Sequence, residues 1–199
     1  MALRLLGPVE SHDVTSLQTL CFVAISLQSS GQLEWCHSCV GVALHSAIAL
    51  GLHQSRNNPP GTLAYEIRKR IFWTILRLDI YSSSMLGISP LLSIDDIDQA
   101  YPEPTISDDF EQDADSLTQA DAITMLVGGN AHITLTSIVP TIMKYRRDFN
   151  SMKQTSTVNL QSLVYSSGMF AIEEKLCAWL QELPRELLLG CQASARSER

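Results

Sequence analysis

The spacing of apolar residues is the feature that most constrains how this 199-residue chain can fold. These residues recur at steps of three and four positions, which places one apolar stripe along a helix, whereas a half-buried strand would alternate at every second position. The first stripe, in residues 13–30, consists of Leu17, Leu20, Cys21, Ala24 and Leu27. Because this spacing continues through most of the chain and no alternating segment interrupts it, the sequence predicts an all-α protein.

Polar caps and glycines divide the pattern into separate helices. Asp13 is the predicted N-cap of the first helix, which is expected to end at Gly31. A second helix over residues 32–50 is expected to end at Gly51. Because the link between the two helices is short, they are expected to pack as an antiparallel hairpin. The predicted fold is therefore an irregular multi-helix array that begins with an antiparallel helical hairpin.

A third helix is expected to begin at its N-cap Thr62 and to end at Gly87 and Pro90. Its predicted inward positions are Leu63, Ile67, Ile71, Ile75 and Leu78. Its predicted outward positions form a basic edge, Arg68, Lys69 and Arg77. The preceding residues 54–61 are polar and contain two prolines, so a loop is expected there.

The second half of the chain also has a helical pattern, after an acidic, irregular connector over residues 93–115. A helical region over residues 116–149 should be kinked or split at Pro140, because proline lacks the N–H that a helix needs. A turn is then expected over residues 150–157.

A last helix is expected over residues 158–182, before Pro184. It carries an apolar set of side chains, Val164, Ala171, Leu176, Trp179 and Leu180.

The overall charge and hydropathy exclude some classes of function. The formal net charge is −7, with 14 basic and 21 acidic residues. Because duplex affinity depends largely on Lys and Arg, this balance argues against nucleic-acid binding by the chain itself. No apolar run approaches the roughly 20 residues of a membrane span, so no membrane association is expected.

Cys36, His37 and Cys39 are the residues most suggestive of a metal site, since thiolates and imidazoles bind zinc. On a helix, Cys36 and Cys39 share a face, whereas His37 points about 100° away from Cys36. The three cannot converge on one ion, so the cysteines are expected to be buried and structural.

Asp95, Asp96 and Asp98 could suggest a cation site, but the glycine and closing glutamate of a calcium loop are missing. These carboxylates are expected instead to pair with the third helix and to fix the turn that precedes them. No metal-binding, cofactor-binding or catalytic residue is therefore assigned, and the chain is not expected to be an enzyme.

Several of these segments together resemble the fungal-specific transcription factor domain, the middle homology region of fungal binuclear zinc cluster regulators. The residues that carry the resemblance are Leu50, Gly51, Leu52, His53, Arg70, Trp73, Asp79, Gly87, Pro90, Asp96 and Asp98. Their order and spacing agree with the family best over residues 17–102. One departure is that Ile88 and Ser89 stand where the family often has arginine and proline.

The resemblance implies a nuclear protein that regulates transcription. It identifies residues 13–190 as one regulatory domain, with the acidic connector inside it. Residues 1–12 would be a disordered or partial N-terminus and residues 191–199 a frayed tail. The family's six-cysteine zinc cluster is not matched by the five cysteines of this chain. The chain is therefore expected to be a truncated member that binds no zinc.

Contact with DNA is accordingly expected only indirectly, or through a missing N-terminal module. The partners that the resemblance implies are proteins of a transcription complex and, in addition, a small-molecule effector. Two alternatives stay open: a ligand-sensing helical receptor domain and a non-functional remnant. A receptor or an enzyme would bring His45, His53 and acidic side chains to one cavity.

Overall fold

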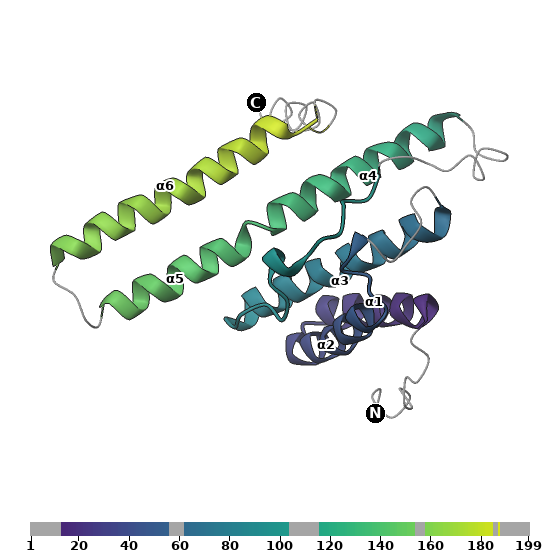
Figure 1. Cartoon of the computed structure of the whole chain (residues 1–199), viewed down its shortest axis with the longest axis horizontal. Coiled ribbons are helices and arrows are strands. Elements are labelled where there is room, and N and C mark those ends of the chain that lie inside the picture. Colours follow the sequence, from purple (N-terminus) through teal and green to yellow (C-terminus); the bar gives the residue numbers. More distant parts are fainter. Residues whose placement is uncertain (1–12, 56–61, 104–115, 154–157, 185–186, 188–199) are drawn as a thin grey trace. The chain divides into compact units, whose positions relative to one another are not determined.

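The computed structural model describes residues 13–55, 62–103, 116–153, 158–184 and 187 (Figure 1). Within these ranges the chain is helical, and the one pairing of extended backbone is an isolated parallel bridge between Gln54 and Asp98. The all-α prediction is therefore confirmed. The chain divides into two compact units, Met1–Pro102 and Glu103–Arg199, and the division falls within the predicted acidic connector.

The first unit consists of α1 (Val14–Ser29), α2 (Leu33–Ala49), α3 (Leu63–Leu86) and a short 3₁₀ helix, η3 (Ile94–Asp96). The helices α1 and α2 pack as the predicted hairpin, and both contact α3. Most of the predicted apolar stripes of the hairpin are buried, at Leu17, Leu20, Cys21, Ala24, Cys36, Cys39, Ala43 and Ala47, whereas Leu27 is half-buried.

Local capping sets the ends of these helices. The Asp13 side chain accepts a hydrogen bond of 2.7 Å from the Ser16 N–H, and the Thr62 hydroxyl accepts one of 3.2 Å from the Tyr65 N–H. Such bonds satisfy N–H groups that have no partner inside the helix. The three helices are followed by left-handed glycines with φ near 70°, which are Gly31, Gly51 and Gly87. The predicted helix ends are thus confirmed.

The inner face of α3 differs in part from the prediction. Ile71, Ile75 and Leu78 are buried as predicted, whereas Leu63 and Ile67 are only half-buried. The two outer arginines, Arg68 and Arg77, are also half-buried.

Lys69 was predicted to face outward, and that prediction is wrong, because its side chain is only 1% exposed. An ion pair with Glu66, one turn earlier in α3, compensates the buried charge.

The second unit consists of α4 (Ser116–Thr136), α5 (Val139–Lys153) and α6 (Val158–Glu182). Figure 1 shows α4 and α5 following each other almost in line, and α6 running back beside them. The predicted split is confirmed. Pro140 is the second residue of α5, where a missing N–H costs nothing because the first turn has no helical acceptor for it.

The turn predicted over residues 150–157 is wrong for residues 150–153, which continue α5. Residues 154–157 lie outside the described residues. So do the predicted terminal segments 1–12 and 191–199, most of the loop before α3 and the later part of the acidic connector.

The helix α6 has the predicted bounds but buries a neighbouring face. Ile172 is buried and Trp179 is half-buried, whereas Ala171, Leu176 and Leu180 are exposed. None of the described helices is both long enough and apolar enough to cross a membrane.

Candidate functional site

Several of the predicted motif residues contact residues 97–102, here called the return segment. The Asp98 N–H donates to the His53 carbonyl at 3.0 Å, and the Ser55 N–H donates to the Asp98 carbonyl at 3.1 Å. These bonds flank the parallel bridge at Gln54. His53, the last residue of the Leu-Gly-Leu-His step, therefore contacts Asp98 through backbone atoms. Residues of other types at these positions could form the same backbone hydrogen bond.

Gln99 was not singled out from the sequence, yet it is central to this arrangement. Its side chain is 6% exposed. Its Nε2 donates to the Leu52 carbonyl at 3.0 Å, and its Oε1 accepts from the Tyr65 hydroxyl at 3.4 Å. Gln99 thus links the backbone after α2 to the first turn of α3. A glutamine among acidic residues carries no sequence signal for such a role.

Trp73, a predicted motif residue, holds the return segment from the side of α3. Its Nε1–H donates to the Ala100 carbonyl at 2.9 Å, and its ring stacks on Tyr101 with centroids 4.6 Å apart. A buried tryptophan usually finds such a partner for its N–H. The family's tryptophan therefore positions the chain that returns after α3.

A buried charge pair lies beside this tryptophan. The Lys69 ammonium forms an ion pair with Glu66 and donates to the Tyr101 carbonyl at 3.4 Å. It also lies 4.7 Å from the centroid of the Tyr65 ring. Because an unpaired buried charge is very costly, Lys69 and Glu66 depend on each other. The basic edge predicted for α3 thus contributes to the interior.

Asp79 fixes the turn that follows α3. Its side chain is fully buried, its Oδ2 accepts from the Leu91 N–H at 2.8 Å, and its Oδ1 accepts from the Ser83 hydroxyl at 3.2 Å. Burial raises the pKa of the Asp79 carboxyl, while these hydrogen bonds act in the opposite direction. Gly87, with φ of 74°, turns the chain out of the helix toward Leu91.

The acids expected to hold that turn do not do so. Asp95, Asp96 and Asp98 are exposed, and among the described residues no ion pair links them to α3. The Asp98 carboxylate accepts from the Ser55 hydroxyl at 3.5 Å. The prediction of paired carboxylates is therefore wrong, and the buried Asp79 serves in their place.

The remaining motif residues shape the core and the backbone. Leu52 is fully buried, and its N–H donates to the Ala47 carbonyl at 3.0 Å. Leu50, Arg70 and Pro90 are half-buried. Several motif residues therefore contact the return segment, and the others lie in the helices and turns that precede it.

The predicted structural role of the cysteines agrees with their burial. Cys36 and Cys39 are buried, and the nearby His37 Nδ1 lies 3.3 Å from the Ser82 hydroxyl. Burial raises the pKa of both thiols, and it raises that of Cys21 to about 11. Thiols with raised pKa values stay protonated and are poor metal ligands. In the ranges that the structure covers, no three His, Cys, Asp or Glu side chains are grouped to hold a metal ion.

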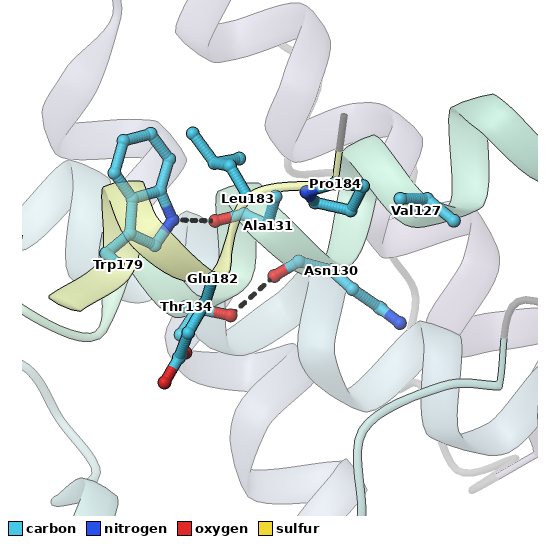
Figure 2. A pocket seen from close by; sticks show the side chains of 8 residues that line it. All are labelled: Val127, Asn130, Ala131, Thr134, Trp179, Glu182, Leu183 and Pro184. Atoms are coloured by element: carbon cyan, nitrogen blue, oxygen red, sulfur yellow. Dashed lines mark hydrogen bonds between the residues drawn. The ribbon is translucent and has the colours of Figure 1, made fainter. Parts of the chain in front are cut away.

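A separate cavity of about 300 Å³ lies in the second unit, between α4 and the end of α6 (Figure 2). Its apolar lining consists of Val127, Ala131, Leu183 and Pro184. Its polar lining consists of Asn130, Thr134 and Glu182. Trp179 closes one end, and its Nε1–H donates to the Ala131 carbonyl at 2.8 Å. Neither His45 nor His53 lines this cavity.

These contacts define a class of protein. It is an all-helical domain in which buried polar side chains form hydrogen bonds to the backbone of other segments. The chain belongs to the fungal specific transcription factor domain family, whose family model matches residues 8–197. The resemblance inferred from the motif residues is therefore confirmed.

Relatives with this domain are regulators of transcription. The chain is 32% identical over 190 residues to Activator of stress genes 1 of Saccharomyces cerevisiae, with 94% of this chain and 19% of the relative covered. It is 30% identical over 193 residues to Activator of stress genes protein 1 of Candida albicans, with 88% and 19% covered.

A third relative is Transcriptional activator protein acu-15 of Neurospora crassa, 28% identical over 152 residues, with 75% of this chain and 15% of the relative covered. The chain thus spans about a fifth of the length of the first two curated relatives. No solved structure matches the chain.

Proposed function

We propose that this chain is a nuclear regulatory domain that modulates transcription by binding proteins or an effector, without catalysis and without contacting DNA itself. The observation that carries the proposal is the family match over residues 8–197, together with relatives whose names describe transcriptional activators. The whole relatives are about five times longer, so their DNA contacts and target genes are not transferred to this chain.

The surface of the helical hairpin supports a role in protein contact. Phe22 and Ile25 on α1 are 72% and 40% exposed, and Trp35 and Val42 on α2 are 53% and 49% exposed. Protein interfaces are enriched in such aromatic side chains. The net charge of −7 favours partners other than nucleic acid.

The state of the cysteines supports the absence of a zinc cluster from this chain. Cys21, Cys36 and Cys39 lie in the helical core, with pKa values raised by burial, while Cys177 is exposed on α6. Within the part of the chain that the structure describes, these four cysteines give no set of converging thiolates, which supports zinc-dependent DNA binding by another polypeptide segment.

A tethering experiment tests the regulatory role. The full chain is fused to an unrelated DNA-binding domain in a fungal cell, and transcription is measured from a reporter that carries the matching sites. We expect reporter output to change severalfold relative to the DNA-binding domain alone. Equal output, with the fusion present in the nucleus at the same abundance, would contradict the proposal.

A gel-shift experiment tests the second part of the proposal. The purified chain is titrated against a pool of random duplexes at about 150 mM salt, and weak or no retention is expected because the chain is acidic. Tight, sequence-selective retention would overturn the claim that this chain does not contact DNA.

A further inference from the structure

The helix α6 has an exposed apolar face as well as the face that packs within its own unit. Ile172 is buried and Trp179 donates a hydrogen bond to Ala131 of α4, so these residues mark the inner side of the helix. Figure 1 shows α4 and α5 on the same side of α6. The exposed face, here called the outer seam, consists of Met169, Phe170, Glu173, Leu176, Cys177 and Leu180. A contiguous exposed apolar surface of this kind marks a site of protein contact.

The spacing of the outer seam is that of one strand of a coiled coil. Successive steps of four, three and four residues separate Met169, Glu173, Leu176 and Leu180. At 100° per residue these four positions lie within about 60° of one another around the helix, and they extend over about 17 Å, or three turns. A straight, convex stripe of this length fits one partner helix lying alongside it, whereas small molecules bind in concave sites.

The carboxylate of Glu173 lies at the centre of the outer seam. Its neighbours at three and four positions before and after it are Met169, Phe170, Leu176 and Cys177. A polar side chain at a core position of a helix pair reduces the stability of the pair and restricts which partners fit. A helix that covers the seam takes water from this carboxylate, so a cation opposite Glu173 is needed to compensate the lost hydration.

A second copy of α6 does not supply this cation. In a parallel pair Glu173 would face Glu173 of the second copy, and two carboxylates would repel each other. In an antiparallel pair Glu173 would face Leu176 of the second copy, and the carboxylate would be covered by an apolar side chain. The occupant that the charge favours is therefore a helix of different sequence.

We propose that the outer seam binds one amphipathic helix of another protein, and that this helix carries a lysine or arginine opposite Glu173. Its apolar side chains pack on Met169, Leu176 and Leu180, and Phe170 borders the contact. The inference names the kind of partner for the regulatory domain, and it rests on the proposed function only for the biological role of the contact.

The thiol of Cys177 provides a readout inside the outer seam. Cys177 is exposed, whereas Cys21, Cys36 and Cys39 are buried and serve as controls for the folded state. The full chain is treated briefly with N-ethylmaleimide, and alkylation is measured by mass spectrometry of the tryptic peptide that begins at Leu176, in which Cys177 is the only cysteine. A helix bound to the seam should slow this alkylation.

Three synthetic peptides serve as probe helices. Each has two heptads with leucine at the core positions and a lactam bridge on the outer side that stabilises the helix, and they differ only at the central core position, which is Lys, Leu or Glu. We expect the Lys peptide to bind with a Kd on the order of 100 µM and to slow alkylation of Cys177 about threefold at twice that concentration. The Glu peptide should bind at least roughly fivefold more weakly, and the Leu peptide should be intermediate.

A charge reversal tests the assignment of Glu173. In Glu173→Lys the order should invert, so that the Glu peptide protects Cys177 and the Lys peptide does not. The matched control is Glu174→Lys, because Glu174 is exposed about 100° away around α6, and the Lys peptide should remain the best protector. For each variant the rates with and without peptide are compared as a ratio, since a charge at position 173 also changes the reactivity of the thiol itself.

Three outcomes would contradict the proposal. The first is no protection of Cys177 by any peptide up to about 2 mM, or equal protection by all three. The second is an order of the peptides that does not change in Glu173→Lys. The third concerns the chain without peptide: alkylation of Cys177 as slow as that of the buried cysteines, or slower at higher chain concentration, would assign the seam to the chain itself or to a second copy.

The two proposals fail separately. Charge-selective protection of Cys177 combined with an inactive reporter fusion would contradict the regulatory role alone. An active reporter fusion combined with no protection would contradict the outer seam alone.

Discussion

The buried Asp79 carboxylate accepts a hydrogen bond of 2.8 Å from the backbone N–H of Leu91. Asp79 lies inside α3 and Leu91 follows the turn that ends this helix, so the bond ties the turn to the helix that it leaves. The second carboxylate oxygen accepts from Ser83. Both oxygens thus act as acceptors, and the position requires a side chain with two of them.

Asp79→Asn should lower the free energy of unfolding by about 1 kcal/mol, because the two hydrogen bonds that the carboxylate accepts are replaced by weaker ones. The asparagine oxygen can still accept from the Leu91 N–H, but its NH₂ then faces Ser83, whose hydroxyl must turn from donor to acceptor. Urea unfolding measures the change. Asp95→Asn is the matched control, because Asp95 is exposed, and it should be nearly neutral. Equal midpoints for the two variants would contradict this role of Asp79.

The raised pKa of Asp79 also predicts a pH dependence with a definite sign. Because the folded state holds this proton more tightly than the unfolded state, stability falls as pH rises from the ordinary aspartate pKa of 3.8 through the raised pKa. The stability advantage of wild type over Asp79→Asn should therefore be larger at the acidic end of this window than at pH 7. Urea unfolding of both proteins at several pH values checks this, and a difference that grows with pH would contradict it.

Lys69→Met should lower the free energy of unfolding, by up to about 3–5 kcal/mol, because the buried Glu66 carboxylate loses its ion pair with Lys69. The double variant Lys69→Met with Glu66→Gln removes both charges and should recover much of this loss. Thermal unfolding of the single and double variants gives the coupling energy. Additive effects of the two substitutions would show that the pair does not interact in the folded protein.

Gly168→Ala should destabilise the packing of α5 against α6. A Cβ atom added at Gly168 would lie 2.1 Å from a ring carbon of Tyr145, so the Tyr145 ring or one of the two helices must shift. Overpacking of this kind costs about 1–3 kcal/mol. The control is Gly129→Ala in α4, where a Cβ meets nothing within 4 Å, and it should stabilise by about 0.5–1 kcal/mol. Urea unfolding should therefore give opposite signs for the two variants, and the same sign would contradict this account.

Local chemistry explains which parts of the fold could be predicted. The side chains of Asp13 and Thr62 accept hydrogen bonds from N–H groups three positions further along the chain. Gly87 ends α3 because it adopts a left-handed backbone conformation. Such signals lie within one turn of the chain and are visible in the sequence. The period of the apolar residues in α1 and α2 likewise requires no knowledge of the partner helix.

Tertiary neighbours explain what could not be predicted. In the sequence Lys69 resembles an ordinary surface lysine, and its contact with Tyr101 exists only in the folded chain. The hydrogen-bond partners of Gln99 are 34 and 47 positions away in the sequence. In α6 two adjacent stripes are both apolar, and the Gly168 contact with Tyr145 belongs to the buried one. No local pattern distinguishes these outcomes, because each is decided by a residue on another element.

Amide hydrogen exchange tests most directly whether the motif residues hold the return segment against α3. The Asp98 and Ser55 amides should be protected in the full chain, since both donate to backbone carbonyls across the junction. Trp73→Phe removes the indole donor to Ala100 and should speed exchange at both amides about fivefold, the equivalent of about 1 kcal/mol. Trp35→Phe, at an exposed site, should leave both rates unchanged. Exchange of Asp98 and Ser55 at the rate of an unfolded peptide, or rates that do not respond to Trp73→Phe, would contradict the account.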